Sequence, residues 1–296
     1  MYPIVLAHGF FGFAQMGSLT YFKGVEKYLK KRFPGIKILI TEVAPNDLIK
    51  DRAQQLWDQV EKLDEKFHII AHSMGGLDSR FMISPQGLNK SERAISLTTL
   101  SSPHRGSPVA QFIIDRFKMF NDDDIERFIQ RVPALNRTAK KIVKKMRKKS
   151  EVWRYLLELF SFTKKAMTNL TPAYLEEFNQ KYTDAPQVKY FSYAGVTGPG
   201  EKDYLPALIY LHWVINYLSK DEQAGGRNDG LVSVESSKWG TFKGEVPADH
   251  FKMVGHDLSP RVWLRRLLPF LPFLKSFNHL KLYKQMVNDL QELEAD

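Results

Sequence analysis

The sequence FHIIAHSMGG, at residues 67–76, joins an apolar strand pattern to a predicted helix over 73–83. Ser73 lies at the turn between them. A serine at a sharp strand-to-helix turn exposes its Oγ at the C-terminal edge of a parallel sheet, in front of a helix N-terminus. Gly75 fits the G-x-S-x-G pattern, and Ala71 replaces its first glycine. The stretch therefore predicts a nucleophile, although a glycine-rich turn after a buried strand would give a similar pattern.

A second stretch, YPIVLAHGFFG at residues 2–12, is a strand pattern that ends in a His-Gly turn. An acyl-transfer serine needs two backbone N–H donors for the oxyanion that forms on the attacked carbonyl. We expect one donor from Met74, which follows the serine, and the other from Phe10, which follows Gly9. His8 is expected to hold this loop by hydrogen bonds rather than to react.

A third pair of stretches carries an acid and a base, GGRNDGLV at residues 225–232 and VPADHF at residues 246–251. Asp229 lies in a turn rich in glycine and asparagine, and His250 follows it in the second stretch. The order Ser73, Asp229, His250 is the chain order of α/β-hydrolases and of no other serine hydrolase fold considered.

Other acids and bases remain as alternatives. The rival acids either flank the histidine too closely or lack a turn context: Asp203, Asp249 and Asp257. Among the other histidines, His256 is the most serious competitor as a base. The rest are expected to be structural, because they lie within a strand, beside the serine, in a turn or in apolar helical runs: His68, His72, His104, His212 and His279.

Together these co-linear motifs resemble a bacterial triacylglycerol lipase of the α/β-hydrolase superfamily. Further matching segments are residues 52–60, 97–107, 170–195 and 228–239. The resemblance implies Ser73 as nucleophile, His250 as base and Asp229 as orienting acid, with Phe10 and Met74 as oxyanion donors. It predicts a serine ester hydrolase acting on lipids, a carboxylic ester hydrolase, with a phospholipase A or lysophospholipase at anionic membranes as the alternative.

The chain departs from this family at a calcium site near the histidine. The family uses an aspartate two residues after the histidine and a glutamine four residues further on, where this chain has Lys252 and His256. An ammonium repels a hard dication, and the oxygen ligands are missing. We therefore expect no metal and no cofactor.

The alternation of patterns predicts an α/β-hydrolase fold, a mostly parallel sheet flanked by helices. Strand patterns cover residues 2–7, 36–43, 67–72, 95–100 and 188–194, and helical patterns cover 20–33, 49–62 and 73–83. From about residue 108 to 187 only helical patterns occur, at 109–120, 122–131, 137–149, 152–164 and 172–182. An all-helical insertion at this place is expected to be a cap or lid.

This organisation divides the chain into four parts. We expect a first core part over 1–107, a helical cap over 108–187, a second core part with the acid and histidine loops over 188–258, and a C-terminal apolar-basic helical extension over 259–296. The length and the 43% hydrophobic content allow a large core. An apolar, flexible lining from residues near the serine suits fatty acyl chains: Phe10, Phe11, Phe13, Met16 and Met74.

The charge of the chain is basic, with 43 Lys+Arg against 33 Asp+Glu. A nucleic-acid-binding protein would explain this excess, but no recognition fold or aromatic-basic interleaving accompanies it. The sequence lacks cysteine and shows no evident signal peptide or membrane-spanning run. The sequence therefore does not decide whether the protein stays inside the cell, is exported without a cleavable signal, or has a leader that is missing from the sequence.

Two segments predict peripheral binding to anionic membranes. Residues 137–149 carry eight basic residues and no acidic one, Lys140, Lys144 and Lys148 among them, opposite an apolar helical stripe. Residues 261–275 mix arginines with bulky apolar residues and Trp263, as interfacial segments do. A solvated helix face and a tail packed on the sheet are the simpler alternatives.

Overall fold

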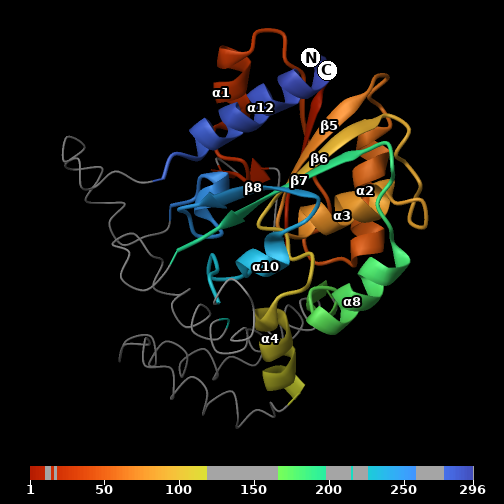
Figure 1. Cartoon of the computed structure of the whole chain (residues 1–296), viewed down its shortest axis with the longest axis vertical. Coiled ribbons are helices and arrows are strands. Elements are labelled where there is room, and N and C mark those ends of the chain that lie inside the picture. The colour runs from red at the N-terminus through yellow and green to blue at the C-terminus, as the bar shows by residue number, and fades with distance from the viewer. Residues whose placement is uncertain are drawn as a thin grey trace, which may run out of the picture.

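A six-stranded parallel sheet forms the centre of the molecule. The computed structural model describes residues 1–10, 15–16, 19–118, 166–197, 215, 226–257 and 277–295. The strands lie in the order β4-β1-β5-β6-β7-β8, and every neighbouring pair is parallel (Figure 1). Their bounds are β1 Ile4–Ala7, β4 Ile38–Ile40, β5 Phe67–His72, β6 Ala94–Leu100, β7 Lys189–Gly195 and β8 Thr241–Val246.

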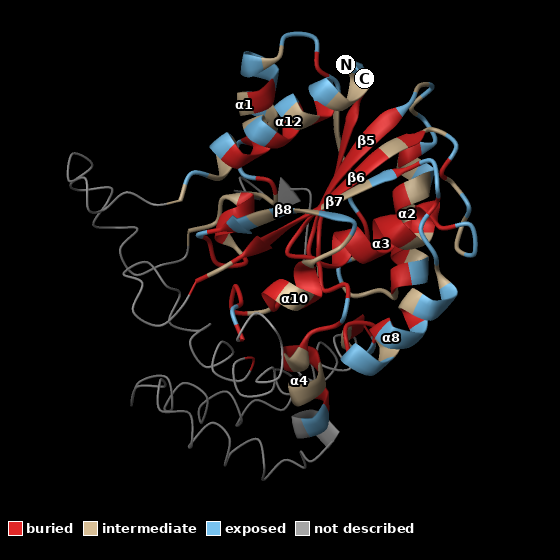
Figure 2. Cartoon of the chain, in the orientation of Figure 1, coloured by how far each residue is buried: buried red, intermediate tan, exposed pale blue. Residues whose placement is uncertain are grey.

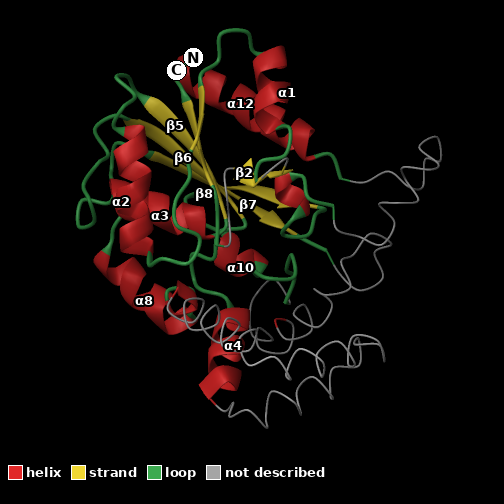
Figure 3. Ribbon diagram, turned by 180° about the vertical axis from the view of Figure 1, so that it is seen from behind, coloured by secondary structure: helices red, strands yellow, loops and turns green. Residues whose placement is uncertain are grey.

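Helices cover both faces of the sheet, because its central strands are apolar on both sides. Alternate residues of β1 point to opposite faces, so Ile4 and Leu6 join one core and Val5 and Ala7 the other. The first core packs under α1 (Val25–Arg32) and α12 (His279–Ala295), and the second under α2 (Ile49–Val60) and α3 (Met74–Ile83). Figure 3 shows these two helical layers from behind, and Figure 2 shows the buried strands between them.

The predicted α/β-hydrolase fold is confirmed, with three corrections to its elements. Residues 20–24 are not helical. Thr20 is the last residue of a short hairpin formed by β2 (Gln15–Met16) and β3 (Leu19–Thr20). Gly24 has a φ of 72°, a left-handed conformation that does not occur within an α-helix. Strand β8 and this hairpin were not predicted. The sequence TFKGEV of β8 has exposed residues at every second position and contains few apolar ones, because the strand forms a partly exposed edge of the sheet.

The two ends of the predicted cap meet at the sheet edge. Helix α4 (Pro108–Lys118) leads into the insertion and α8 (Pro172–Lys181) leads out of it. The Ser107 amide donates to the Leu170 carbonyl at 2.8 Å, and the Ile49 amide donates to the Asn169 side chain at 2.9 Å. The predicted helices at 122–131, 137–149 and 152–164 lie outside the described residues, so the cap and the domain boundaries stay predictions.

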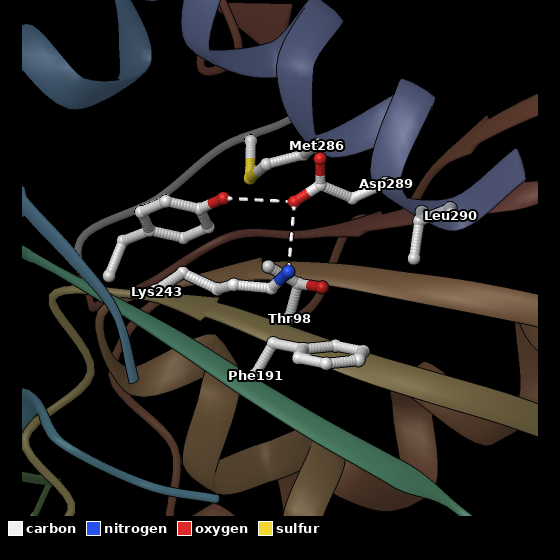
Figure 4. A pocket seen from close by; sticks show the side chains of 7 residues that line it. Thr98, Phe191, Lys243, Met286, Asp289 and Leu290 are labelled. Atoms are coloured by element: carbon white, nitrogen blue, oxygen red, sulfur yellow. Dashed lines mark hydrogen bonds and ion pairs between the residues drawn. The ribbon is translucent and has the colours of Figure 1, made fainter. Parts of the chain in front are cut away.

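Helix α12 is fastened to the sheet by a polar cluster. Lys243 on β8 lies 3.2 Å from the Asp289 carboxylate, and the Tyr193 hydroxyl of β7 donates to the same carboxylate at 3.5 Å (Figure 4). The cavity beneath them, about 10 Å³, holds at most a water. The end of the C-terminal tail thus packs on the core, whereas Trp263 lies outside the described residues. None of the described helices has both the length and the apolarity needed to cross a bilayer.

Candidate active site

Ser73 sits in a strained turn between β5 and α3. Its φ of 56° and ψ of −131° lie in a region that L-residues rarely adopt, which costs about 1–3 kcal/mol. The turn is held because the Ser73 amide donates to the Leu100 carbonyl of β6 at 2.9 Å. Met74 then begins α3, so the helix N-terminus lies directly behind the serine.

Two glycines allow the loop after β1 to lie against this turn. A Cβ on Gly75 would come within 2.5 Å of the Ala7 carbonyl oxygen and 2.6 Å of that of His8. A Cβ on Gly9 would come within 2.6 Å of the Ser73 Cβ. Only glycine fits at either position, and the backbone of the loop at residues 8–10 therefore lies beside the serine.

His250 and Asp229 are paired. The His250 Nδ1 donates to the Asp229 Oδ2 at 2.7 Å, and both side chains are buried. The other carboxylate oxygen, Oδ1, accepts the amides of Leu231 at 2.9 Å and Val232 at 2.8 Å. Because the acid is fixed at both oxygens, it holds the imidazole with Nδ1 protonated and Nε2 as the basic nitrogen.

The Asp229 turn owes its shape to Asn228. The Asn228 Oδ1 accepts the Gly230 amide at 2.8 Å, and its Nδ2 donates to the Gly226 carbonyl at 2.7 Å. Such side-chain bonds to the local backbone are typical of asparagine turns. The sequence NDG therefore sets the local shape of the turn that carries the carboxylate.

The loop at residues 8–10 is held from several sides. Burial and the nearby Arg52 charge lower the pKa of His8 to about 4, so its ring is neutral. The Nδ1 contacts the Gly9 carbonyl at 3.0 Å, and Nε2 accepts the Val43 amide at 3.2 Å. The Gly9 amide donates to the Tyr21 hydroxyl at 3.1 Å, so Gly9 is not available as an oxyanion donor while that bond holds.

Arg52 is a buried residue that the sequence analysis did not single out as part of the site. Its guanidinium donates to the carbonyls of His8 at 2.9 Å and Ala44 at 2.7 Å, and it pairs with Asp78 of α3 at 2.8 Å. Burial raises the pKa of Asp78 to about 6, against the lowering effect of Arg52. The signal was present, because Arg52 falls on the apolar face of α2.

The rival bases have other partners. His68 lies at the far end of β5 from Ser73 and contacts Ser96 and Glu294. His104 contacts the Thr99 hydroxyl at 3.1 Å. His256 and His279 each donate through Nε2 to backbone carbonyls, and His72 accepts from Tyr21; His212 lies outside the described residues.

The rival acids and the expected lining are placed only in part. Asp249 accepts the backbone amides of residues 251 and 252 and pairs with the Lys252 ammonium. Asp203, Phe11 and Phe13 lie outside the described residues, and so does the side chain of Met16. Phe10 and Met74 belong to an apolar cluster between α2, α4 and α8, formed with Ile49, Leu77, Ala110, Leu170, Leu175 and Phe178.

Comparison with known proteins identifies the family. Residues 3–184, well over half of the chain, match the family model for palmitoyl protein thioesterase. The chain belongs to the palmitoyl protein thioesterase family. A triacylglycerol lipase of Saccharomyces cerevisiae is 31% identical over 80% of this chain, and one of Vibrio cholerae is 32% identical over 38%. The resemblance to triacylglycerol lipases is therefore confirmed, and it extends beyond bacteria.

Solved structures give the same fold for this palmitoyl protein thioesterase family member. The lipase of Staphylococcus hyicus aligns over 99% of this chain and 96% of its own, with a TM-score of 0.65 and 17% identity. A Bacillus licheniformis lipase aligns over 90% and 91%, with a TM-score of 0.61 and 18% identity. The chain spans 63% of the yeast relative and 36% of the Vibrio relative.

The residues at the position where related lipases bind calcium do not fit a calcium ion. The Lys252 ammonium, almost fully buried, lies 3.4 Å from the Asp249 Oδ2 and directly follows the His250 loop. A fixed ammonium at this place repels a divalent cation and neutralises the carboxylate beside it. Within the described part of the chain, no group of three or more His, Cys, Asp or Glu side chains is arranged to hold a metal ion.

We predict that chelation leaves this family member unchanged. EDTA should alter neither the melting temperature nor the rate of ester hydrolysis, because Lys252 supplies the positive charge beside Asp249. Differential scanning fluorimetry and an ester assay, each with EDTA and with added CaCl₂, measure this. A chelator-induced drop that calcium restores would contradict the prediction.

Proposed function

We propose that the protein is a serine ester hydrolase that acts on lipids through a covalent acyl-enzyme, as a carboxylic ester hydrolase of the lipase and esterase kind. The observation that carries the proposal is the buried His250–Asp229 pair at 2.7 Å, whose imidazole packs 4.5 Å from the ring of His72, the residue before the strained Ser73. The same chain contains the glycine contacts that bring a second backbone loop beside the serine. This combination is the recurring arrangement of acyl-transfer serine enzymes.

The proposed reaction proceeds in two halves. His250 Nε2 takes the proton of the Ser73 hydroxyl as its Oγ attacks the ester carbonyl, and Asp229 stabilises the imidazolium that forms. The amides of Met74 and Phe10 are the proposed donors to the oxyanion. The imidazolium then protonates the leaving alcohol, and water releases the fatty acid by the same steps in reverse order.

A fatty acyl thioester is the second candidate substrate, because the matching family model is that of palmitoyl protein thioesterases. Attack on a thioester forms the same acyl-enzyme and releases a thiol in place of an alcohol. The apolar cluster around Phe10 and Met74 suits an acyl chain in either case.

One assay tests the proposal and ranks its substrates. Hydrolysis is measured on p-nitrophenyl esters of increasing chain length, an emulsified triacylglycerol, a phospholipid and a palmitoyl thioester, with Ser73→Ala as control. We expect long acyl chains to be preferred and the activity to vanish in the variant. Hydrolysis of the phospholipid alone would replace the lipase proposal with that of a phospholipase, and no hydrolysis of any substrate would refute both.

We also propose that the protein docks on anionic membranes through the segments at 137–149 and 261–275, which lie outside the described residues. Basic side chains such as Lys140, Lys144 and Lys148 each add about 1 kcal/mol of attraction near an anionic surface before salt screening. Trp263 suits the interface between headgroups and acyl chains. Lipid esters would then be taken from the surface to which the protein is bound.

Liposome flotation measures this docking. Binding should increase with the fraction of anionic lipid, weaken in high salt, and fall when Lys144, Lys145, Lys148 and Lys149 are changed to glutamate. A matched control changes four exposed lysines elsewhere, Lys27, Lys31, Lys62 and Lys66, to glutamate. Equal binding to zwitterionic and anionic liposomes, or no binding to either, would rule out the docking proposal.

A further inference from the structure

Tyr21 lies at the centre of a hydrogen-bond chain that joins three parts of the candidate site. Its hydroxyl accepts the Gly9 amide at 3.1 Å and lies 2.7 Å from the His72 Nδ1. Gly9 belongs to the loop beside Ser73, and His72 is the residue that precedes Ser73. Tyr21 itself comes from the segment after β3, which the sequence analysis did not connect with the site.

The direction of the two hydrogen bonds follows from their chemistry. The Gly9 amide can only donate, so it occupies a lone pair of the Tyr21 oxygen, and the hydroxyl proton is left for the His72 Nδ1. Burial raises the pKa of Tyr21 above its ordinary value and lowers that of His72 well below its own, so both groups are neutral. The bond therefore selects the His72 tautomer with the proton on Nε2.

His72 links the hydrogen bonds of Tyr21 to His250. The two ring centroids are 4.5 Å apart with an angle of 50° between the planes. His72 is buried, and its ring also makes a backbone hydrogen bond with His250, which opposes the lowering of the His72 pKa by burial. The ring is therefore fixed on one side by Tyr21 and on the other by packing against His250.

The backbone of Tyr21 is also held. His256 donates through Nε2 to the carbonyls of Thr20 and Tyr21, each at 3.0 Å. The Lys23 amide donates to the Val254 carbonyl at 3.0 Å. Both contacts tie the Tyr21 segment to the turn that follows His250, so the segment and the histidine loop are positioned together.

We propose that Tyr21, acting through His72, is a positioning residue that sets the Gly9–Phe10 loop and the His250 ring around Ser73. This inference rests on the proposed ester hydrolysis, in which the nucleophile, the base and the oxyanion donors must be aligned at once. Tyr21 does not contact the reacting atoms in this role. Misplacement of such groups by about 1 Å lowers turnover by up to about 100-fold without weakening substrate binding.

The first test is Tyr21→Phe, which removes only the hydroxyl. We expect kcat on a p-nitrophenyl ester to fall about 10- to 100-fold with KM unchanged. Tyr283→Phe is the control, because Tyr283 is buried in the core against which Tyr21 packs, and its hydroxyl makes no hydrogen bond to the described residues. The assay runs well below the melting temperature of each variant, so that a loss of stability does not lower kcat.

Variants of His72 test whether Tyr21 acts through this histidine. His72→Asn keeps an acceptor oxygen near the position of Nδ1 and should retain more activity than His72→Phe, which removes the acceptor. If the two residues act as a unit, Tyr21→Phe combined with His72→Phe should lower kcat no further than His72→Phe alone. Fully additive losses would overturn the inference.

A measurement that needs no turnover separates this inference from the proposed function. In ¹⁵N-glycine-labelled protein, Tyr21→Phe should speed hydrogen exchange of the Gly9 amide, and ¹⁵N-histidine labelling should show His72 as the Nε2–H tautomer only in the wild type. Unchanged Gly9 exchange, or a kcat within twofold of wild type, would overturn the role of Tyr21. A wild-type protein that hydrolyses no ester refutes the proposed function, while the NMR result still decides whether Tyr21 holds the loop.

Discussion

Ser73→Ala and His250→Ala are each expected to lower ester turnover about 10⁴- to 10⁶-fold while leaving the fold intact. The loss is this large because nucleophile and base act as a unit, so removal of one leaves the other without a function. Asp229→Asn should cost a similar amount or less, since an amide at Oδ2 no longer selects the Nδ1–H tautomer of His250. Steady-state hydrolysis of a p-nitrophenyl ester measures all three.

Covalent labelling and thermal unfolding complete this test. A fluorophosphonate probe should label the wild type and not Ser73→Ala, and the melting temperature of that variant should stay equal or rise, because alanine removes only one oxygen. Ser102→Ala is a matched control, as Ser102 is buried near the same turn and its hydroxyl has no hydrogen-bond partner among the described residues. Substantial esterase activity in Ser73→Ala would show that the nucleophile is elsewhere.

Much of the sheet could be predicted from the sequence because its central strands are buried on both faces. The runs at 67–72 and 95–100 are nearly continuous in apolar or small residues, and they became β5 and β6 with an offset of at most one residue. Strand β8 was not predicted because an edge strand needs only one apolar face, and Gly244 leaves even that face short of apolar side chains. The helix expected from residue 20 fails at Gly24, whose left-handed backbone no apolar periodicity reveals.

The residues of the candidate site likewise fall into those that a local sequence pattern indicates and those that it does not. Ser73, Asp229 and His250 lie in short motifs whose local geometry is encoded by neighbouring glycine and asparagine residues, so a single sequence is enough to propose them. Tyr21 and Arg52 act through contacts between distant elements, and no local pattern records which partner a buried hydroxyl or guanidinium will meet. For Arg52 the apolar periodicity of α2 offered a hint, because a charge on a buried face must be paired.

Arg52→Met is expected to destabilise the protein by about 3–5 kcal/mol, because it leaves the Asp78 carboxylate buried without its partner. It also removes the donor to the carbonyls of His8 and Ala44. Chemical denaturation at pH 8 measures the free energy of unfolding. The loss should shrink as the pH falls toward about 6, because without Arg52 nothing offsets the raising effect of burial on the pKa of Asp78, so the carboxyl in the variant takes a proton in the folded state at a higher pH than in the wild type.

The double variant Arg52→Met with Asp78→Leu separates stability from positioning. With both charges removed, much of the lost stability should return, since an apolar pair can replace a buried ion pair at little cost. Turnover should be low in both Arg52→Met and the double variant, because the loop at residues 8–10 lacks the guanidinium that holds the His8 carbonyl in each. Arg52→Lys should rescue only in part, as an ammonium cannot reproduce the planar fork. Arg32→Met, exposed on α1, is the control. If turnover returned together with stability in the double variant, Arg52 would be a structural residue with no part in arranging the loop beside Ser73.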